Sequence, residues 1–90
     1  MKYKVLVIYD VGDTKRRNRI NKTLEHFGVR IQRSAFECYI DEYDYEKLVN
    51  KLNRLHKEDD IIKIYRFTSR VEEKEMGVFE KPPTSEFEIL

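Results

Sequence analysis

Asp10 is the residue of this sequence best suited to holding a divalent cation. It ends the apolar run Tyr3–Tyr9, where aspartate is a poor strand former, and it precedes a turn. Mg²⁺ in proteins is usually held by one or two carboxylates, with water and substrate phosphate completing its coordination. One Asp10 supplies a single carboxylate, so two chains that face each other would supply a pair. The competing interpretation of Asp10 is ordinary Asp-x-Gly turn chemistry.

Basic residues are concentrated in the first third of the chain. Residues 1–33 carry nine Lys and Arg against three Asp and Glu, whereas residues 34–90 carry nine against fourteen. Arginine has a planar guanidinium group that suits phosphate oxygens, so this distribution favours an anionic partner. The candidate phosphate-binding residues are Lys15, Arg16, Arg17, Arg19, Arg30 and Arg33. The competing interpretation is a plain solvated helix face.

The helical phase divides the basic residues into two groups. At 100° per residue, Arg16 and Arg17 flank the apolar stripe that begins at Ile20, and they start the helix next to Asp10. We expect these two guanidinium groups to neutralise charge on a phosphate held at Asp10. A second group, which would track backbone phosphates from the opposite, exposed side, consists of Lys15, Arg19 and Lys22.

The elements that must position these residues follow from periodicity and caps. The pattern predicts a strand over Tyr3–Tyr9, a helix from Thr14 to about Phe27, an extended segment Val29–Ile40 that turns near Arg33–Ser34, a second helix starting at Asp44, and a strand over Ile61–Phe67. Asp13 is expected to cap the first helix, with a metal ligand as its alternative role, and Gly28 is expected at its C′ position. Asp44 is expected to cap the second helix.

This order, β-α-β-β-α-β, predicts an α+β, ferredoxin-like sandwich in which two helices cover one face of an antiparallel sheet. We assign residues 1–78 to this domain and residues 79–90 to a C-terminal tail whose last residues could form an edge strand with a partner subunit. The first strand is apolar on both faces, although the helices cover only one. A second copy stacked sheet on sheet would cover the other, so we expect a homodimer.

Other features of the sequence exclude several classes of protein. Cys38 is the only cysteine, so the chain has no intrachain disulfide and no zinc motif. The apolar run near the N-terminus is too short for a signal peptide or a membrane span, and we expect a soluble, cytoplasmic protein without a membrane partner. No phosphate-binding glycine loop is present, and neither His26 nor His56 has a catalytic spacing.

Phe36 allows two interpretations. The alternation of Phe36, Cys38 and Ile40 favours a place in the core. On the opposite assignment, the ring would lie beside Arg30 and Arg33, where it could stack on a nucleic-acid base.

These residues, taken together, closely resemble a known family. The fragments that carry the resemblance are Val7–Val11, Asp13, Arg16–Arg19 and Phe27–Cys38, and the likeness extends in order over residues 3–67. They resemble the CRISPR-associated protein two family, the small endonuclease-like subunit of the spacer-acquisition machinery. The resemblance implies a ferredoxin-like homodimer with Mg²⁺, or another divalent cation such as Mn²⁺, between symmetric Asp10 side chains. It also implies that C-terminal strands pair onto the partner subunit.

The resemblance further implies a function. Members are described as metal-dependent endonucleases that hydrolyse phosphodiester bonds of single-stranded RNA or double-stranded DNA, and as the bridge between integrase subunits that insert protospacer DNA. The family implicates positions that correspond here to Tyr9, Arg17, Arg19, Arg30 and Phe36. We therefore expect Asp10, Arg17 and Tyr9 to be catalytic. One departure is Arg33, where many relatives have an aromatic residue.

Two alternatives to a nuclease stay open at this point. The first is a non-catalytic DNA-binding scaffold of the integration complex, which needs the basic surface but no metal chemistry. The second is a ferredoxin-like sensor of a small ligand, which would show no salt-dependent affinity for nucleic acid.

Overall fold

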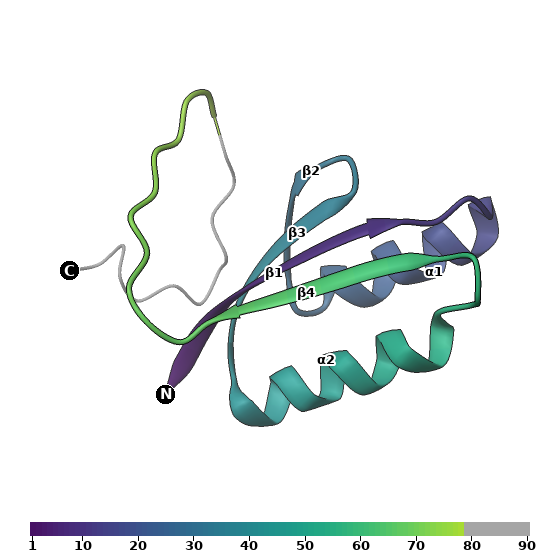
Figure 1. The fold of residues 1–90 in the computed structure, drawn as a ribbon, viewed down its shortest axis with the longest axis horizontal. Coiled ribbons are helices and arrows are strands. Elements are labelled where there is room, and N and C mark those ends of the chain that lie inside the picture. The colour runs from purple at the N-terminus through teal and green to yellow at the C-terminus, as the bar shows by residue number, and fades with distance from the viewer. Residues whose placement is uncertain (79–90) are drawn as a thin grey trace.

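The structure is a computed structural model that describes residues 1–78 of the 90-residue chain. Its elements are β1 (Lys2–Asp10), α1 (Thr14–Glu25), β2 (Gly28–Gln32), β3 (Ala35–Asp41), α2 (Glu42–Leu55) and β4 (Ile61–Phe67), as Figure 1 shows. This order confirms the predicted βαββαβ arrangement and the predicted bounds of the last strand. The tail and the edge strand predicted within residues 79–90 lie outside the described residues. Neither of the two helices within residues 1–78 has the length and apolar character needed to cross a membrane.

The four strands form one antiparallel sheet in the order β2-β3-β1-β4. In β1, Val7 lies opposite Phe36 of β3 on one side and Ile64 of β4 on the other. The pairing of β2 with β3 is interrupted by a bulge between Arg30 and Gln32. The central position of β1 places its end, where Asp10 lies, between the ends of two neighbouring strands.

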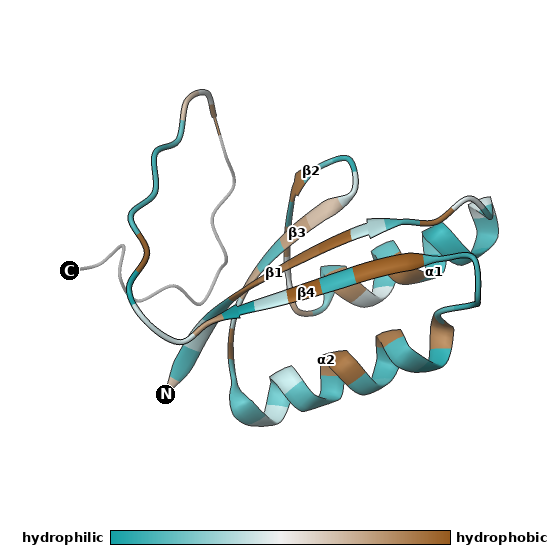
Figure 2. Ribbon diagram, in the orientation of Figure 1, coloured by the Kyte–Doolittle hydropathy of each residue, from teal (hydrophilic) through white to brown (hydrophobic). Residues whose placement is uncertain are grey.

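Both helices pack on the same face of the sheet, which we call the covered face. The core there joins strand residues such as Val5 and Val7 with Ile20 of α1 and Leu48 of α2, all of which have no exposed area. Apolar residues therefore run along β1 and along the inner sides of the helices, while the outer sides of the helices are hydrophilic (Figure 2). The alternation of β1 sends every second side chain to the other face, which neither α1 nor α2 covers.

The capping residue predicted from the sequence is confirmed at α1 and is wrong at α2. Asp13 caps α1, as predicted, and its Oδ2 accepts a hydrogen bond of 2.8 Å from the Arg16 amide. The prediction of Asp44 as the second cap is wrong, because Asp41 takes that position and accepts a hydrogen bond of 2.8 Å from the Asp44 amide. Both aspartates satisfy the sequence preference, but only Asp41 leaves the strand at the point where the helix turns away.

Gly28 is required for a different reason than the sequence suggested. Helix α1 ends at Glu25 rather than near Phe27, and Gly28 opens β2 instead of occupying a left-handed C′ position. Within residues 1–78, Gly77 is the only residue with a positive φ. A Cβ at Gly28 would overlap the carbonyl oxygen of Glu37 and would lie 2.7 Å from Sγ of Cys38. The glycine therefore permits close contact between β2 and β3 rather than an unusual backbone turn.

Candidate functional site

Asp10 is the last residue of β1, and its side chain is exposed. It lies directly across from Ile61, the first residue of β4. By the alternation of the strand, Asp10 is on the same face as Leu6 and Ile8, the face that the helices do not cover. Within residues 1–78, no hydrogen bond or ion pair engages the Asp10 carboxylate. It is therefore available to a ligand from solvent or from a second chain.

Arg17 holds the backbone that follows Asp10. Its Nη1 donates a hydrogen bond of 2.9 Å to the carbonyl oxygen of Val11, a buried residue, and its Nη2 donates one of 3.4 Å to Oγ1 of Thr14. The side chain was predicted to lie near Asp10, and it does so by binding the adjacent loop. Arg17 thus fixes the direction in which the chain leaves β1, which determines where the Asp10 carboxylate is held.

Arg16 is bound by a carboxylate that the sequence analysis did not single out. Its Nε donates to Oδ2 of Asp60 at 2.6 Å and its Nη2 donates to Oδ1 at 2.9 Å, a two-pronged contact. The Asp60 side chain is only 1% exposed, and its Oδ2 also accepts a hydrogen bond of 2.9 Å from the Lys57 amide. The Arg16 guanidinium holds the pKa of the Asp60 carboxyl below its usual range, against the opposite effect of burial.

This contact changes the expected position of Arg16. We expected its guanidinium to reach toward a phosphate at Asp10, and the structure instead directs it to the loop between α2 and β4. From the sequence, the acidic run of Glu58, Asp59 and Asp60 predicts only a turn. The sequence did contain one indication, since Asp60 directly precedes an apolar strand, where a charged side chain needs a partner if it is buried.

Tyr9 and Phe36 lie on the covered face, opposite to Asp10. Phe36 is fully buried and Tyr9 is 3% exposed, with their ring centroids 6.3 Å apart. The Tyr9 hydroxyl donates a hydrogen bond to Oδ1 of Asn21 in α1, and burial raises the pKa of the Tyr9 phenol. The core interpretation of Phe36 is therefore confirmed, and its ring is not presented to a nucleic-acid base. Asn21 is a second partner that the sequence did not reveal.

The remaining basic candidates fall into three places. Arg30 projects from β2 over the Phe36 ring, with its guanidinium carbon 5.5 Å from the ring centroid. Arg33 lies in the exposed turn between β2 and β3, and this turn reaches the end of β1, where the Tyr9 amide donates to the Ser34 carbonyl oxygen at 3.1 Å. The exposed outer side of α1 carries Lys15, Arg19 and Lys22. The structure therefore brings Arg17 and Arg33 to the end of the sheet where Asp10 lies, and Asp60 holds Arg16 beside Ile61, the residue across from Asp10.

The donor set at this end bears on whether a metal ion could bind. Carboxylate oxygens are suitable ligands for Mg²⁺, and Asp10 provides two that are exposed. Asp13, the alternative ligand, uses Oδ2 to cap α1. Within the described residues, no three His, Cys, Asp or Glu side chains form a group that could hold a metal ion. The residues fit a hard cation only if a second carboxylate arrives from another molecule.

The sheet face that carries Asp10, which we call the open face, has exposed apolar side chains toward the end of β1 and on β4, beside charged ones such as Lys4 and Glu37. Its exposed large residues include Ile8 at 42%, Ile61 at 60% and Tyr65 at 40% of their full area. Lys63 lies among them, with its ammonium nitrogen 5.6 Å from the Tyr65 ring centroid. An apolar sheet face of this kind is usually covered in soluble proteins.

The chain is similar to known proteins over most of its length. The family described as "CRISPR associated protein Cas2" matches residues 1–75. The "CRISPR-associated endoribonuclease Cas2" of Mycobacterium tuberculosis (strain CDC 1551 / Oshkosh) is 44% identical over 62 residues, which are 69% of this chain. This match spans 55% of the length of the mycobacterial protein, so the chain aligns with little more than half of that relative.

Solved structures are similar in fold as well. The "hypothetical protein TT1823 from Thermus thermophilus" is 36% identical with a TM-score of 0.73, over 91% of this chain and 99% of that one. A chain of a structure entitled "Partial Cas6-RT-Cas1--Cas2 complex" is 27% identical with a TM-score of 0.61, over 71% of this chain and 77% of that one.

Proposed function

Because this chain belongs to the CRISPR-associated Cas2 family, we propose that it is a homodimeric, nucleic-acid-binding subunit of CRISPR adaptation that bridges integrase subunits during spacer acquisition. We further propose that its dimer hydrolyses phosphodiester bonds of single-stranded RNA or double-stranded DNA with the help of Mg²⁺ or Mn²⁺. The single observation that carries this proposal is the position of Asp10, exposed at the end of β1 on the open face. The name of the mycobacterial relative, an endoribonuclease, supports the nuclease part.

The exposed apolar residues of the open face are the reason for proposing a dimer. Exposed apolar side chains of β1 and β4, such as Ile8 and Tyr65, would be buried if a second copy stacked its sheet on this one. A two-fold axis near the end of β1 would bring two Asp10 carboxylates together, since such an interface repeats the same surface on both chains. Two carboxylates match the ligand set that Mg²⁺ commonly takes from a protein.

Each side chain around Asp10 then has a role that its contacts support. The two Asp10 carboxylates would hold the ion, which when bound would polarise a phosphate and lower the pKa of a water molecule. Arg17 positions Asp10 through the Val11 carbonyl, rather than by reaching the phosphate itself. Tyr9 supports the same strand end from the covered face through Asn21. Arg33, exposed in the neighbouring turn, is the guanidinium group free to meet a phosphate.

The proposal is tested by comparing Asp10→Asn with Asp13→Asn. Asparagine caps helices about as well as aspartate, so Asp13→Asn removes a nearby charge without removing the cap of α1. We expect Asp10→Asn to reduce Mg²⁺-dependent cleavage of labelled RNA and DNA to background, while Asp13→Asn retains it. Circular dichroism checks that both variants fold. Cleavage by Asp10→Asn at the rate of the unaltered chain would contradict the catalytic role.

A non-catalytic scaffold is the second candidate function. It is favoured by the observation that Arg16 and Arg17, the arginine residues nearest Asp10 in the sequence, are both engaged within their own chain. A scaffold predicts that Asp10→Asn leaves spacer integration unchanged in a complex reconstituted with the integrase. It also predicts that neutralising exposed cations such as Arg19 weakens DNA binding.

A further inference from the structure

The two helices carry matching stripes of exposed cations. On α1 the stripe consists of Lys15, Arg19 and Lys22, and on α2 it consists of Lys47, Lys51 and Arg54. Both follow the spacing i, i+4, i+7, which places the three side chains of each stripe on one side of their helix. All six residues are exposed. The α2 stripe had no assigned role in the sequence analysis.

The two stripes flank the contact between the helices on its outer, exposed side. Helices α1 and α2 pack side by side and run in opposite directions, because each follows a strand of opposite direction. The ammonium nitrogen of Lys51 lies 5.9 Å from the ring centroid of Phe27, just after α1, so the α2 stripe is turned toward α1. On α1, Arg16 reaches Asp60 beyond the end of α2, and Arg19 follows it on that side of the helix.

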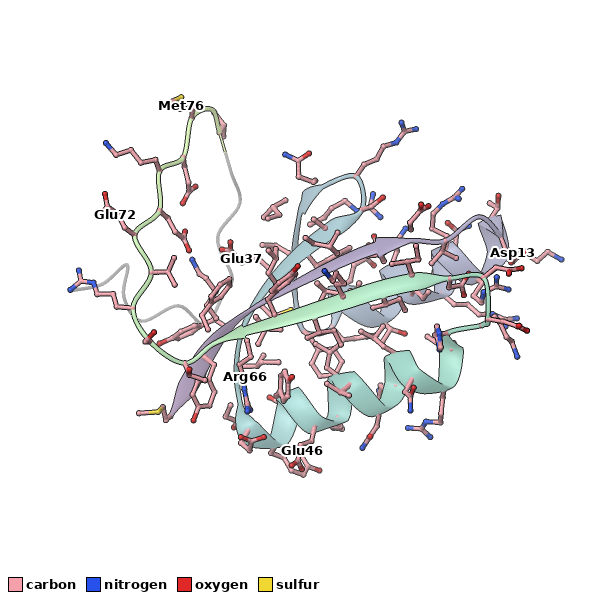
Figure 3. All side chains as sticks on the ribbon, viewed as in Figure 1. Asp13, Glu37, Glu46, Arg66, Glu72 and Met76 are labelled. Atoms are coloured by element: carbon pink, nitrogen blue, oxygen red, sulfur yellow. The ribbon has the colours of Figure 1, made fainter. Side chains whose placement is uncertain are left out.

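The stretches of both helices that carry the stripes contain no acidic residue, although Asp44, one turn before Lys47, lies on the same side of α2. Residues 14–24 and residues 47–57 contain no Asp or Glu. On α2, Glu42 is bound to Arg66 at 2.8 Å, and Glu46 lies on the side of the helix away from α1 (Figure 3). None of the six stripe residues forms an ion pair with a carboxylate of the described residues. The two stripes together form a surface with uncompensated positive charge.

This arrangement is not explained by helix stability. The start of a helix carries partial positive charge, so cations there are unfavourable and acids are preferred. The first turn of α1 nevertheless contains no acidic residue and includes Lys15. In α2, Arg54 lies in the last turn, where a cation is favourable, but Lys47 and Lys51 lie earlier. Like charges on adjacent helices also repel, so an anion that binds between them lowers the electrostatic energy of the region.

We propose that the two stripes form one cationic groove that binds the sugar–phosphate backbone of double-stranded DNA, which adds α2 to the nucleic-acid-binding surface. This inference rests on the proposed nucleic-acid binding. Each stripe is about 10 Å long at the rise of an α-helix. Over that length a duplex presents about six phosphate charges, so every cation of a stripe has a phosphate within reach.

A duplex fits this face better than a single strand does. Single-strand binding relies on several aromatic rings that stack with successive bases, whereas α1 and α2 together present one exposed ring, that of Tyr43, with the ammonium nitrogen of Lys47 5.4 Å from its centroid. The groove is on the outer side of the helices, whereas the open face is on the other side of the sheet. A second copy on the open face would therefore leave the groove accessible, so one dimer would present two such grooves.

The test uses three variants of the full chain with equal loss of charge. The α2 variant is Lys47→Gln, Lys51→Gln and Arg54→Gln; the α1 variant is Lys15→Gln, Arg19→Gln and Lys22→Gln; the control is Lys2→Gln, Arg70→Gln and Lys74→Gln, at exposed positions outside both helices. Affinity for a labelled DNA duplex is measured by fluorescence anisotropy over a series of salt concentrations, and circular dichroism confirms folding.

We expect the α2 variant to bind the duplex about 10-fold or more weakly than the control. Each lost phosphate contact reduces the slope of log K against log salt by about 0.9, so the slope should fall by as much as about 2.7. If the α2 variant binds the duplex with unchanged affinity while the α1 variant binds it more weakly, the proposed groove is wrong, although the proposed binding of nucleic acid still holds. No duplex binding by the unaltered chain would refute the proposed function itself. Stronger α2-dependent binding of single-stranded RNA than of the duplex would overturn the choice of DNA.

Discussion

The two faces of the sheet are built from the same strands but differ in what covers them. On the covered face, Val5, Val7 and Phe36 are fully buried against the two helices. On the open face, Ile8 and Tyr65 keep two fifths or more of their area exposed. The first face therefore contributes to folding, whereas the second leaves apolar area available for association. Tyr9 and Asp10 are neighbours in the sequence, yet they belong to different faces and so to different tasks.

The largest expected effect comes from a truncation on the covered face. Phe36→Ala should lower the free energy of unfolding by about 3–5 kcal/mol, because it removes buried area and leaves a cavity. Tyr65→Ala on the open face is the matched control and should change the stability of the monomer by less than about 1 kcal/mol. Urea denaturation at low protein concentration measures both. Equal losses would show that the two faces do not differ as described.

A smaller effect on folding, but a large one on association, is expected from Ile8→Asp. The residue is 42% exposed in one chain, so the monomer should lose only about 1 kcal/mol of stability, because aspartate is a poor strand former. Two added charges facing each other across a dimer should raise the dissociation constant about 100-fold or more. Analytical ultracentrifugation measures the change. A dimer of undiminished affinity would mean that the open face is not the interface.

The smallest expected effect on the free energy of unfolding concerns Cys38, whose burial can be followed through the rate at which its thiol is alkylated. Burial on the covered face raises the pKa of the Cys38 thiol to about 12. The folded state therefore favours the neutral thiol, and this contribution to stability is present below the ordinary thiol pKa and lost as the pH rises toward about 12. At pH 8 we expect alkylation of the native chain to be slow.

The matched control for Cys38 is Glu37→Cys combined with Cys38→Ala. Residue 37 alternates to the open face, where Glu37 is half-buried and lies 3.7 Å from Lys4. A thiol there should react with iodoacetamide much faster than Cys38 does, and the difference should vanish in denaturant. Similar rates in the folded proteins would contradict the assignment of the two faces.

Much of the fold could be predicted because it depends on local patterns. Alternation predicted the strand of residues 61–67, and the Asp13 cap fixed the start of the first helix. Alternation alone could not settle the place of Phe36, since it does not say which face the helices cover. The structure resolves this by burying the ring beneath Arg30.

The candidate site was less predictable because its contacts join distant parts of the sequence. The helical phase correctly placed Arg16 and Arg17 on the inner side of α1, but it could not supply their partners. Asp60 is 44 residues from Arg16, and its burial depends on how the loop before β4 packs. The reason for Gly28 is likewise a contact with β3, which no local pattern in residues 26–30 reveals.

The bond between Arg16 and Asp60 has a consequence for how the molecule opens. It connects the first turn of α1 to the loop that precedes β4, two segments that are far apart in the sequence. Amide hydrogens in both segments should therefore exchange with deuterium in one cooperative step rather than independently. Local fluctuations that release the helix start would also release the strand end opposite Asp10, so the rigidity of the carboxylate depends on a contact on the far side of the sheet.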